Sequence, residues 1–457
     1  MPRLNDVRGL PTTGLNAEQL LHYESLLVDI YTYRPGVQAR VDALLHQSPD
    51  FVMGHVLRGY ALMTDGLRSG VPEARRYLAQ AQQLAAGGTE RERLHIQTLQ
   101  AWVDGRGADR LQALESILAR WPLDLLAYRQ LTAMLFWTGD KRRQLASAMQ
   151  AVPHWQPDVP GFALTLGPLA FALEEDGRYA LAETHAQQAL AYHDADLWAL
   201  HALAHVYEMQ GRVREGDATL SAVAPRLKDF NLFRGHVWWH LALFRMAQGR
   251  MDEVLDLLDR EILPATSMFY LDIQNAASLL ARLEIQGVNV GERWERVADS
   301  AEQTLGQHLV VFTAPHQAMA LARSGRRQAL AQALKGFQDD AQAGVEQAQT
   351  GAAVSAALAL YGTGEYAKFL DLMRVLRYEA ASLGASHAQQ DLYFQLMVDA
   401  ALRIDELPLA RSLLKERLVK HFSDAVGWQR YQEMAGLIDA ASDPQSLRRL
   451  LRTGLPQ

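Results

Sequence analysis

Residues 169–190 read Leu-Ala-Phe-Ala-Leu-Glu-Glu-Asp-Gly-Arg-Tyr-Ala-Leu-Ala-Glu-Thr-His-Ala-Gln-Gln-Ala-Leu. Two segments with alanine or leucine at helical spacing flank Gly177, so the stretch predicts two helices, over residues 162–175 and 180–191, joined by a tight turn. The small residues let the two helices approach closely, and glycine lets the chain reverse in a left-handed conformation at little cost.

The same pattern recurs along the chain. Turn glycines stand at intervals of 38, 34, 38, 38, 38 and 39 residues, at Gly139, Gly177, Gly211, Gly249, Gly287, Gly325 and Gly364. A helical pair of about 34 residues is the tetratricopeptide repeat, and we place the extra residues in the connections. We therefore predict an all-α, tetratricopeptide-like, right-handed superhelical solenoid of about eleven helical hairpins, without strands.

A chain of 457 residues is longer than the roughly 250–300 residues at which a single core stops growing, so it must divide or extend as an array. We expect four segments. Residues 1–50 form a degenerate N-terminal helical pair, and residues 51–155 form divergent repeats. Residues 156–345 form the central repeats with a groove lined by histidine and glutamate. Residues 346–457 form the last repeats and capping helices, over 428–437 and 445–453.

Composition narrows the possible partners. The net charge is −7, the isoelectric point is near 6.1, and no block of Lys or Arg stands out, so we expect no nucleic-acid partner. No apolar run approaches the roughly 20 residues of a membrane span, and the first residues lack the apolar segment of a signal peptide. The absence of cysteine suits the cytoplasm and leaves only His, Asp and Glu as metal ligands.

Two histidine-rich strings fall in consecutive repeats. One reads His201-Ala-Leu-Ala-His205-Val-Tyr-Glu208 and the next reads His236-Val-Trp-Trp-His240. Spacings of three and four residues place side chains on one face of a helix. In the tetratricopeptide motif, counted back from the turn glycine, these positions tend to face the concave groove. We therefore predict that ligand-type side chains from neighbouring helices line one site.

The same positions in adjacent repeats add further candidates. We predict that six residues are catalytic: His201, His205, Glu208, His236, His240 and His316. We predict that seven more bind the ligand: Trp198, Trp239, Asp272, Asn275, Ser278, Arg282 and Glu284. Adjacent first helices of such repeats pack at about 8–10 Å, so side chains from neighbouring repeats can share a ligand.

Three interpretations of this cluster remain open. His201, His205, Glu208 and His240 form an N/O ligand set for a divalent metal such as zinc, iron, manganese or nickel. Without a metal, the same histidines and carboxylates are suited to acid–base chemistry near neutral pH. A polar groove lining without chemistry is the third interpretation. The first two fit a hydrolase or transferase acting on a small molecule; the third leaves the protein without an activity.

A different class of function is a scaffold that binds a peptide or protein partner in its groove. That function predicts a continuous channel lined by varied residues along many repeats. Here the polar cluster spans only about four repeats, and its positions carry mostly His, Trp and acids. We therefore prefer a small molecule or metal as the ligand, and we make no prediction of the oligomeric state.

The chain also resembles the tetratricopeptide-repeat protein 38 family over nearly its whole length. The matching strings are Asp6-Val7-Arg8-Gly9, Asp50-Phe51, residues 201–211, residues 236–240, Asp272 with residues 278–284, and residues 316–320. The resemblance implies a cytosolic tetratricopeptide solenoid and supplies no reaction. Family members typically have His-Asn-x-x-His where this chain has His236-Val-Trp-Trp-His240, so an asparagine is lost while both histidines remain.

Overall fold

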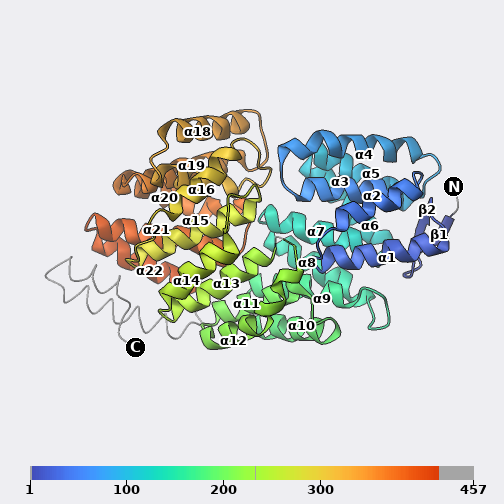
Figure 1. Cartoon of the computed structure of the whole chain (residues 1–457), viewed down its shortest axis with the longest axis horizontal. Coiled ribbons are helices and arrows are strands. Elements are labelled where there is room, and N and C mark those ends of the chain that lie inside the picture. The colour runs from blue at the N-terminus through green and yellow to red at the C-terminus, as the bar shows by residue number, and fades with distance from the viewer. Residues whose placement is uncertain (1–2, 232, 421–457) are drawn as a thin grey trace. The chain divides into compact units, whose positions relative to one another are not determined.

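The computed structural model describes residues 3–231 and 233–420 (Figure 1). This part of the chain contains 22 α-helices and one short two-stranded sheet. Taken in order, the helices make eleven hairpins, so the predicted all-α, tetratricopeptide-like fold is confirmed. The predicted capping helices over 428–437 and 445–453 lie outside the described residues. The four segments expected from the sequence stay a prediction.

The chain divides into two compact units. Within the described residues, unit 1 comprises 3–203 and 226–231, and unit 2 comprises 204–225 and 233–420. The elements that begin in unit 1 are β1 Arg3–Asn5, β2 Pro11–Thr13, α1 Ala17–Tyr31, α2 Val37–Gln47, α3 Val52–Thr64, α4 Val71–Leu84, α5 Glu90–Val103, α6 Gly107–Arg120, α7 Leu125–Trp137, α8 Lys141–Ala151, α9 Ala163–Glu175, α10 Tyr179–Tyr192 and α11 Leu197–Met209.

The division falls inside α11, whose residues from Ala204 onward belong to unit 2. The remaining helices of unit 2 are α12 Val213–Val223, α13 Arg234–Ala247, α14 Met251–Leu257, α15 Tyr270–Ile285, α16 Arg293–Gln303, α17 Thr313–Arg323, α18 Arg327–Gln342, α19 Ala348–Gly362, α20 Tyr366–Glu379, α21 His387–Arg403 and α22 Leu407–Lys420. A π-helical turn, Leu258–Ile262, continues α14.

The turns and small residues act as the sequence predicted. All seven turn glycines adopt positive φ, between 65° and 85°. In the hairpin of α9 and α10, Ala182, Ala186 and Ala189 are fully buried along one face of α10. Alanines recur in unit 2, where Ala298, Ala301, Leu321, Ala329 and Ala333 form one buried cluster of α16, α17 and α18. Close helix pairing therefore rests on short side chains.

The prediction that the chain has no strand is wrong at the N-terminus. β1 and β2 pair antiparallel, with Leu4 opposite Thr12. Three-residue strands are too short to show an alternating pattern in the sequence. The buried carboxylate of Glu92 fixes the hairpin to α5, since it accepts hydrogen bonds from the Thr13 main-chain N at 2.9 Å and from the Thr13 hydroxyl at 3.0 Å.

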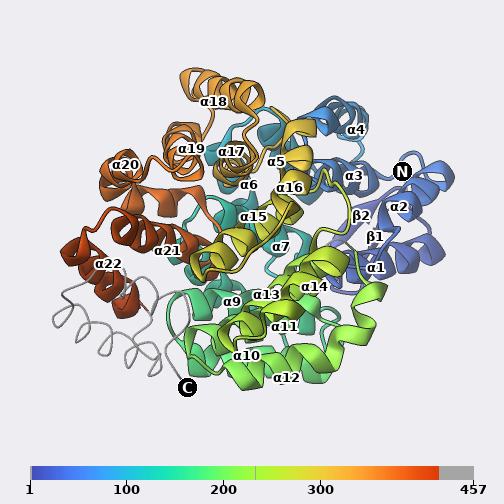
Figure 2. The ribbon, with the colours of Figure 1, turned by 60° about the vertical axis from the view of Figure 1, so that its left-hand side comes forward.

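In unit 2 a helix late in the sequence returns to an earlier one. α21 packs against α15, and the two helices lie close together in Figure 2. Arg282 Nη2 donates to the main-chain oxygen of Ala388 at 2.7 Å, and Gln389 Nε2 donates to Gln274 Oε1 at 3.3 Å. The inner face of α15 is therefore covered by protein, which decides the environment of the predicted site.

Two helical glycines of unit 2 offer a matched test of this close packing. A methyl group at Gly216 in α12 would overlap the ring of Phe244 in α13, whereas one at Gly336 in α18 would meet nothing within 4 Å. We expect Gly216→Ala to lower the free energy of unfolding by about 1–3 kcal/mol through overpacking. Gly336→Ala should raise it by about 0.5–1 kcal/mol, because alanine loses less entropy in a helix.

Urea denaturation followed by circular dichroism would measure both changes. Equal effects of the two substitutions would contradict the packing of α12 on α13 described above.

Candidate functional site

Two helices of unit 2 bring three histidines together. His205 comes from α11, and His236 and His240 come from successive turns of α13. All three are buried, with exposures of 0–3%. The rings of His205 and His240 are 4.5 Å apart, those of His236 and His240 are 4.9 Å apart, and one ring nitrogen of each lies within 4.8 Å of the others. We call His205, His236 and His240 the imidazole cluster.

Acceptors outside the cluster fix the orientation of two of its rings. Nδ1 of His240 lies 3.1 Å from Oε2 of Glu208, and Nδ1 of His236 lies 2.9 Å from Oδ1 of Asn275. Because both partners are oxygen acceptors, each Nδ1 carries the hydrogen and donates it. The neutral ring then keeps its lone pair on Nε2. This arrangement presents the basic nitrogens of both rings in a defined direction.

Burial keeps His236 and His240 uncharged. It lowers the pKa of His236 to about 3, with a smaller contribution from the neighbouring His240, and the hydrogen bond to Asn275 opposes the shift only in part. Burial also lowers the pKa of His240 to about 3, assisted by the positive charge of Arg282. At neutral pH both imidazoles are neutral, which is the form that coordinates metals.

One face of α15 supplies the polar surroundings of the cluster. Asp272, Asn275, Ser278 and Arg282 follow each other at three- and four-residue steps, and each is at most 9% exposed. Oδ2 of Asp272 accepts a hydrogen bond from the hydroxyl of Ser267 at 2.7 Å. Burial raises the pKa of Asp272 to about 6, although the Ser267 hydrogen bond and the charge of Arg234 oppose the shift.

His316 enters from the next repeat, on α17. Its Nδ1 lies 3.0 Å from the main-chain oxygen of Phe312 and donates to it. Burial lowers the pKa of His316 to about 4, and the positive charge of Arg282 adds to this shift. Arg282 therefore influences both His240 and His316, so α13, α15 and α17 surround one buried polar region.

The remaining predicted residues make further contacts. Trp239 is fully buried, with its ring stacked on His236 at 5.1 Å. Glu284 forms an ion pair with Arg323. His201 and Trp198 lie in the part of α11 that belongs to unit 1. There the His201 ring stacks on Phe171 at 5.3 Å, and the Trp198 ring lies 5.3 Å from the same phenylalanine.

The structure corrects the expectation that these side chains line an open groove. His205, His236, His240, Ser278 and His316 are 0–3% exposed. In unit 2, α21 covers α15, a contact that the repeat pattern does not predict. The contribution of α21 could not be predicted from the sequence, because a contact across more than 100 residues leaves no local signal.

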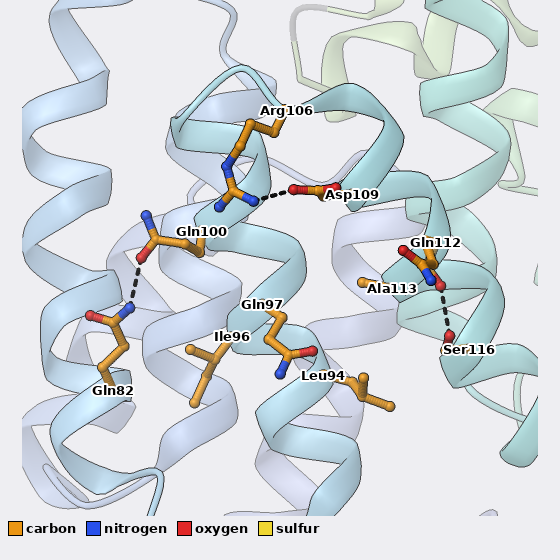
Figure 3. A pocket seen from close by; sticks show the side chains of 10 residues that line it. All are labelled: Gln82, Leu94, Ile96, Gln97, Gln100, Arg106, Asp109, Gln112, Ala113 and Ser116. Atoms are coloured by element: carbon orange, nitrogen blue, oxygen red, sulfur yellow. Dashed lines mark hydrogen bonds and ion pairs between the residues drawn. The ribbon is translucent and has the colours of Figure 1, made fainter.

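A hollow of about 410 Å³ lies elsewhere, among α4, α5 and α6 of unit 1 (Figure 3). Its polar side chains bond mainly to one another: Gln82 Nε2 donates to Gln100 Oε1 at 2.7 Å, and Arg106 pairs with Asp109. It contains no histidine and no cluster of carboxylates. We therefore place the candidate site at the imidazole cluster.

Comparison with known proteins gives distant structural similarity only. No family model matches the chain. A human IFIT1 dimer with m7Gppp-AAAA is 14% identical, covers 93% of this chain and 96% of its own, and has a TM-score of 0.41. A monomeric IFIT1 mutant with Gppp-AAAA is 14% identical, covers 92% of this chain and 96% of its own, and has a TM-score of 0.40. Naa15/Naa10 bound to HypK-THB is 12% identical, covers 94% of this chain and 68% of its own, and has a TM-score of 0.24.

The two IFIT1 structures hold m7Gppp-AAAA and Gppp-AAAA, and our general exclusion of a nucleic-acid partner does not stand beside them. The exclusion used the net charge and the absence of basic runs. Those are properties of the whole sequence, and they do not say which charges a fold brings together. We withdraw the exclusion.

The length and hydropathy of the helices bear on the membrane. Across residues 3–231 and 233–420, no helix is both long enough and apolar enough to cross a bilayer.

The buried histidines predict a loss of stability in acid. The pKa of His316 is near 4 when folded and near 6.5 when unfolded, so unfolding takes up a proton between these values. The stabilisation is complete above pH 6.5 and is lost as pH falls toward 4. At pH 5 a single such histidine lowers the free energy of unfolding by about 2 kcal/mol relative to its value above pH 6.5. We expect the thermal midpoint to fall between pH 7 and 5, and His316→Gln to reduce that fall.

The exposed His46 provides the control, because His46→Gln should leave the pH profile unchanged. A His316→Gln profile identical to the wild-type profile would show that His316 titrates normally in the folded protein.

Proposed function

We propose that the imidazole cluster binds a divalent transition metal ion and that the protein uses this centre on a small molecule. The observation that supports the proposal is the approach of three ring nitrogens to within 4.8 Å of one another, from two helices of one unit. His201 precedes His205 by four residues on α11 and stays a predicted fourth ligand. In this proposal Glu208 accepts the hydrogen bond from His240 and orients that ring, instead of binding the metal as the sequence predicted.

The surroundings of the cluster fit a metal site better than an unspecialised polar core. Metal-binding histidines almost always donate their second ring N–H to a carboxylate or carbonyl oxygen, which fixes the ring and raises its basicity. Glu208 supplies a carboxylate to His240, and Asn275 supplies an amide oxygen to His236. Imidazole nitrogen favours zinc, iron or nickel over magnesium and calcium, which prefer oxygen.

The chemistry that we propose is hydrolysis or group transfer. A metal ion held at the cluster would polarise a substrate oxygen and make bound water more acidic. Among the protein's own groups, Asp272 is suited to accept or return a proton, because its pKa of about 6 lies near neutrality. Asp272 lies beside the start of α13, where a methyl group at Gly235 would come within 3.3 Å of its carboxylate oxygen.

We also propose that the chain belongs to the tetratricopeptide-repeat protein 38 family and works in the cytoplasm. The matching histidine strings and the absence of cysteine support these two proposals. A scaffold that binds an extended peptide is the alternative. The burial of the predicted groove residues favours a small ligand, since an extended peptide needs an exposed surface.

Elemental analysis tests the metal site directly. Protein purified without chelator or affinity metal should contain one zinc, iron, manganese or nickel ion per chain. His240→Ala and His205→Ala should remove it while far-UV circular dichroism stays unchanged. Glu208→Gln should weaken binding by about 10–100-fold, as expected for a residue that supports a ligand.

His46→Ala is the matched control and should retain the metal, because His46 is exposed and remote in sequence from the cluster. Metal-free wild-type protein that also fails to bind any of the four ions on addition would refute the proposal.

A further inference from the structure

The guanidinium of Arg282 is buried without a counter-ion. Arg282 is 3% exposed. Its Nη1 donates to the hydroxyl of Ser278 and also, at 3.4 Å, to the main-chain oxygen of Ser278. Its Nη2 donates to the main-chain oxygen of Ala388. Every one of these acceptors is neutral. Among the residues that the structure describes, no carboxylate lies within ion-pair distance of this arginine.

An unpaired buried charge is costly. Removing one ion from water costs several kcal/mol unless an opposite charge compensates it, so arginine is almost never fully buried alone. Burial accordingly lowers the pKa of Arg282, while Asp391 and Glu208 counteract this only through longer-range attraction. A positive charge kept at such a cost in the middle of the candidate site indicates that an anion completes it.

Two neighbouring donors also lack an acceptor. Nε1 of the fully buried Trp239 and Nδ2 of Asn275, which is 1% exposed, have no hydrogen-bond partner. The Arg282 guanidinium lies 5.6 Å from the centre of the Trp239 ring. Asn275 stands two helical turns before Arg282 on the same face of α15, with Ser278 between them. All these groups offer hydrogens, which calls for a ligand rich in acceptors.

We propose that Arg282, Trp239 and Asn275 bind the carboxylate group of a small organic ligand. A planar carboxylate matches the two parallel N–H groups of a guanidinium and can accept further hydrogen bonds on the same oxygens. One guanidinium neutralises one negative charge. A phosphate dianion would leave a surplus negative charge near Glu208 and Asp391, so the local charge favours the carboxylate.

This inference deepens the proposed function, because it names the class of substrate that would lie beside the metal. Arg282 is close enough to influence His240, and Trp239 lies next to His240 with ring centres 4.9 Å apart. The position of the ligand relative to the metal rests on the proposed function. Carboxylate binding itself uses separate side chains and can be measured in the presence of chelator.

The first experiment measures thermal unfolding of the full chain with chelator present. Sodium acetate, succinate and benzoate are compared with sodium chloride at matched ionic strength. A saturating carboxylate should raise the midpoint by roughly 5 °C over chloride. Arg282→Met should abolish this rise, and Trp239→Phe, which removes only the N–H donor and part of the ring, should weaken binding several-fold.

The same variants separate a binding role from a structural one. Without carboxylate, Arg282→Met should unfold at the wild-type temperature or above it, because methionine removes an uncompensated buried charge. Arg403→Met is the matched control: Arg403 forms an ion pair with Asp399, so its loss should lower the midpoint and leave the carboxylate response intact. If Arg282→Met does not fold, Trp239→Phe alone decides the question.

Several outcomes would overturn the inference. Wild-type protein that responds equally to carboxylate and chloride would do so, as would a carboxylate response that survives in Arg282→Met, or a carboxylate affinity that is unchanged in Trp239→Phe. Stabilisation by inorganic phosphate but not by the carboxylates would refute the ligand class. A carboxylate response in a protein that binds no metal would support this inference and refute only the metal centre.

Discussion

The packing of α21 on α15 is the contact on which the candidate site depends. Tetratricopeptide hairpins stack along one direction, and each usually touches only its neighbours. In unit 2 the chain returns, and α21 covers the inner face of α15. Side chains that would otherwise meet water become buried. Arg282 is buried where its Nη2 donates to Ala388 O of α21, and its positive charge in turn helps to lower the pKa values of His240 and His316. The contact between α15 and α21 therefore affects histidines of α13 and α17 through Arg282.

Local features of the fold could be predicted because their causes are local. The turn glycine and the alanine spacing of each hairpin lie within one repeat, and α9, for example, runs from Ala163 to Glu175, within one residue of the predicted range 162–175. The Asp6-Val7-Arg8-Gly9 string also has a local cause: Oδ1 of Asp6 accepts hydrogen bonds from the main-chain N of Arg8 and Leu10. The hairpin that this turn closes was missed, because three-residue strands carry no periodic signal.

The residues of the candidate site could be predicted from the sequence more readily than their hydrogen bonds and their burial. Helical spacing places His236 and His240 on one face, and the repeat phase places Asn275 and Ser278 in the adjacent helix. Neither pattern shows that Glu208 and Asn275 would bond to Nδ1 of the histidines, because that depends on rotamers fixed by packing. Burial could not be predicted either, since Ala388 lies 106 residues after Arg282. The wrong exclusion of nucleic acid likewise came from an average over the sequence.

The separation between Arg282 and Ala388 has a consequence for how the molecule is assembled. Each hairpin joins residues that are near one another in sequence, so it forms quickly. Two segments about a hundred residues apart meet only after the intervening helices have folded and brought the segments nearer to each other. The contact between α15 and α21 should thus be among the last of unit 2 to form. During biosynthesis the histidines would stay open to water until α21 arrives, and a ligand that enters in that interval would afterwards leave only as fast as α21 detaches.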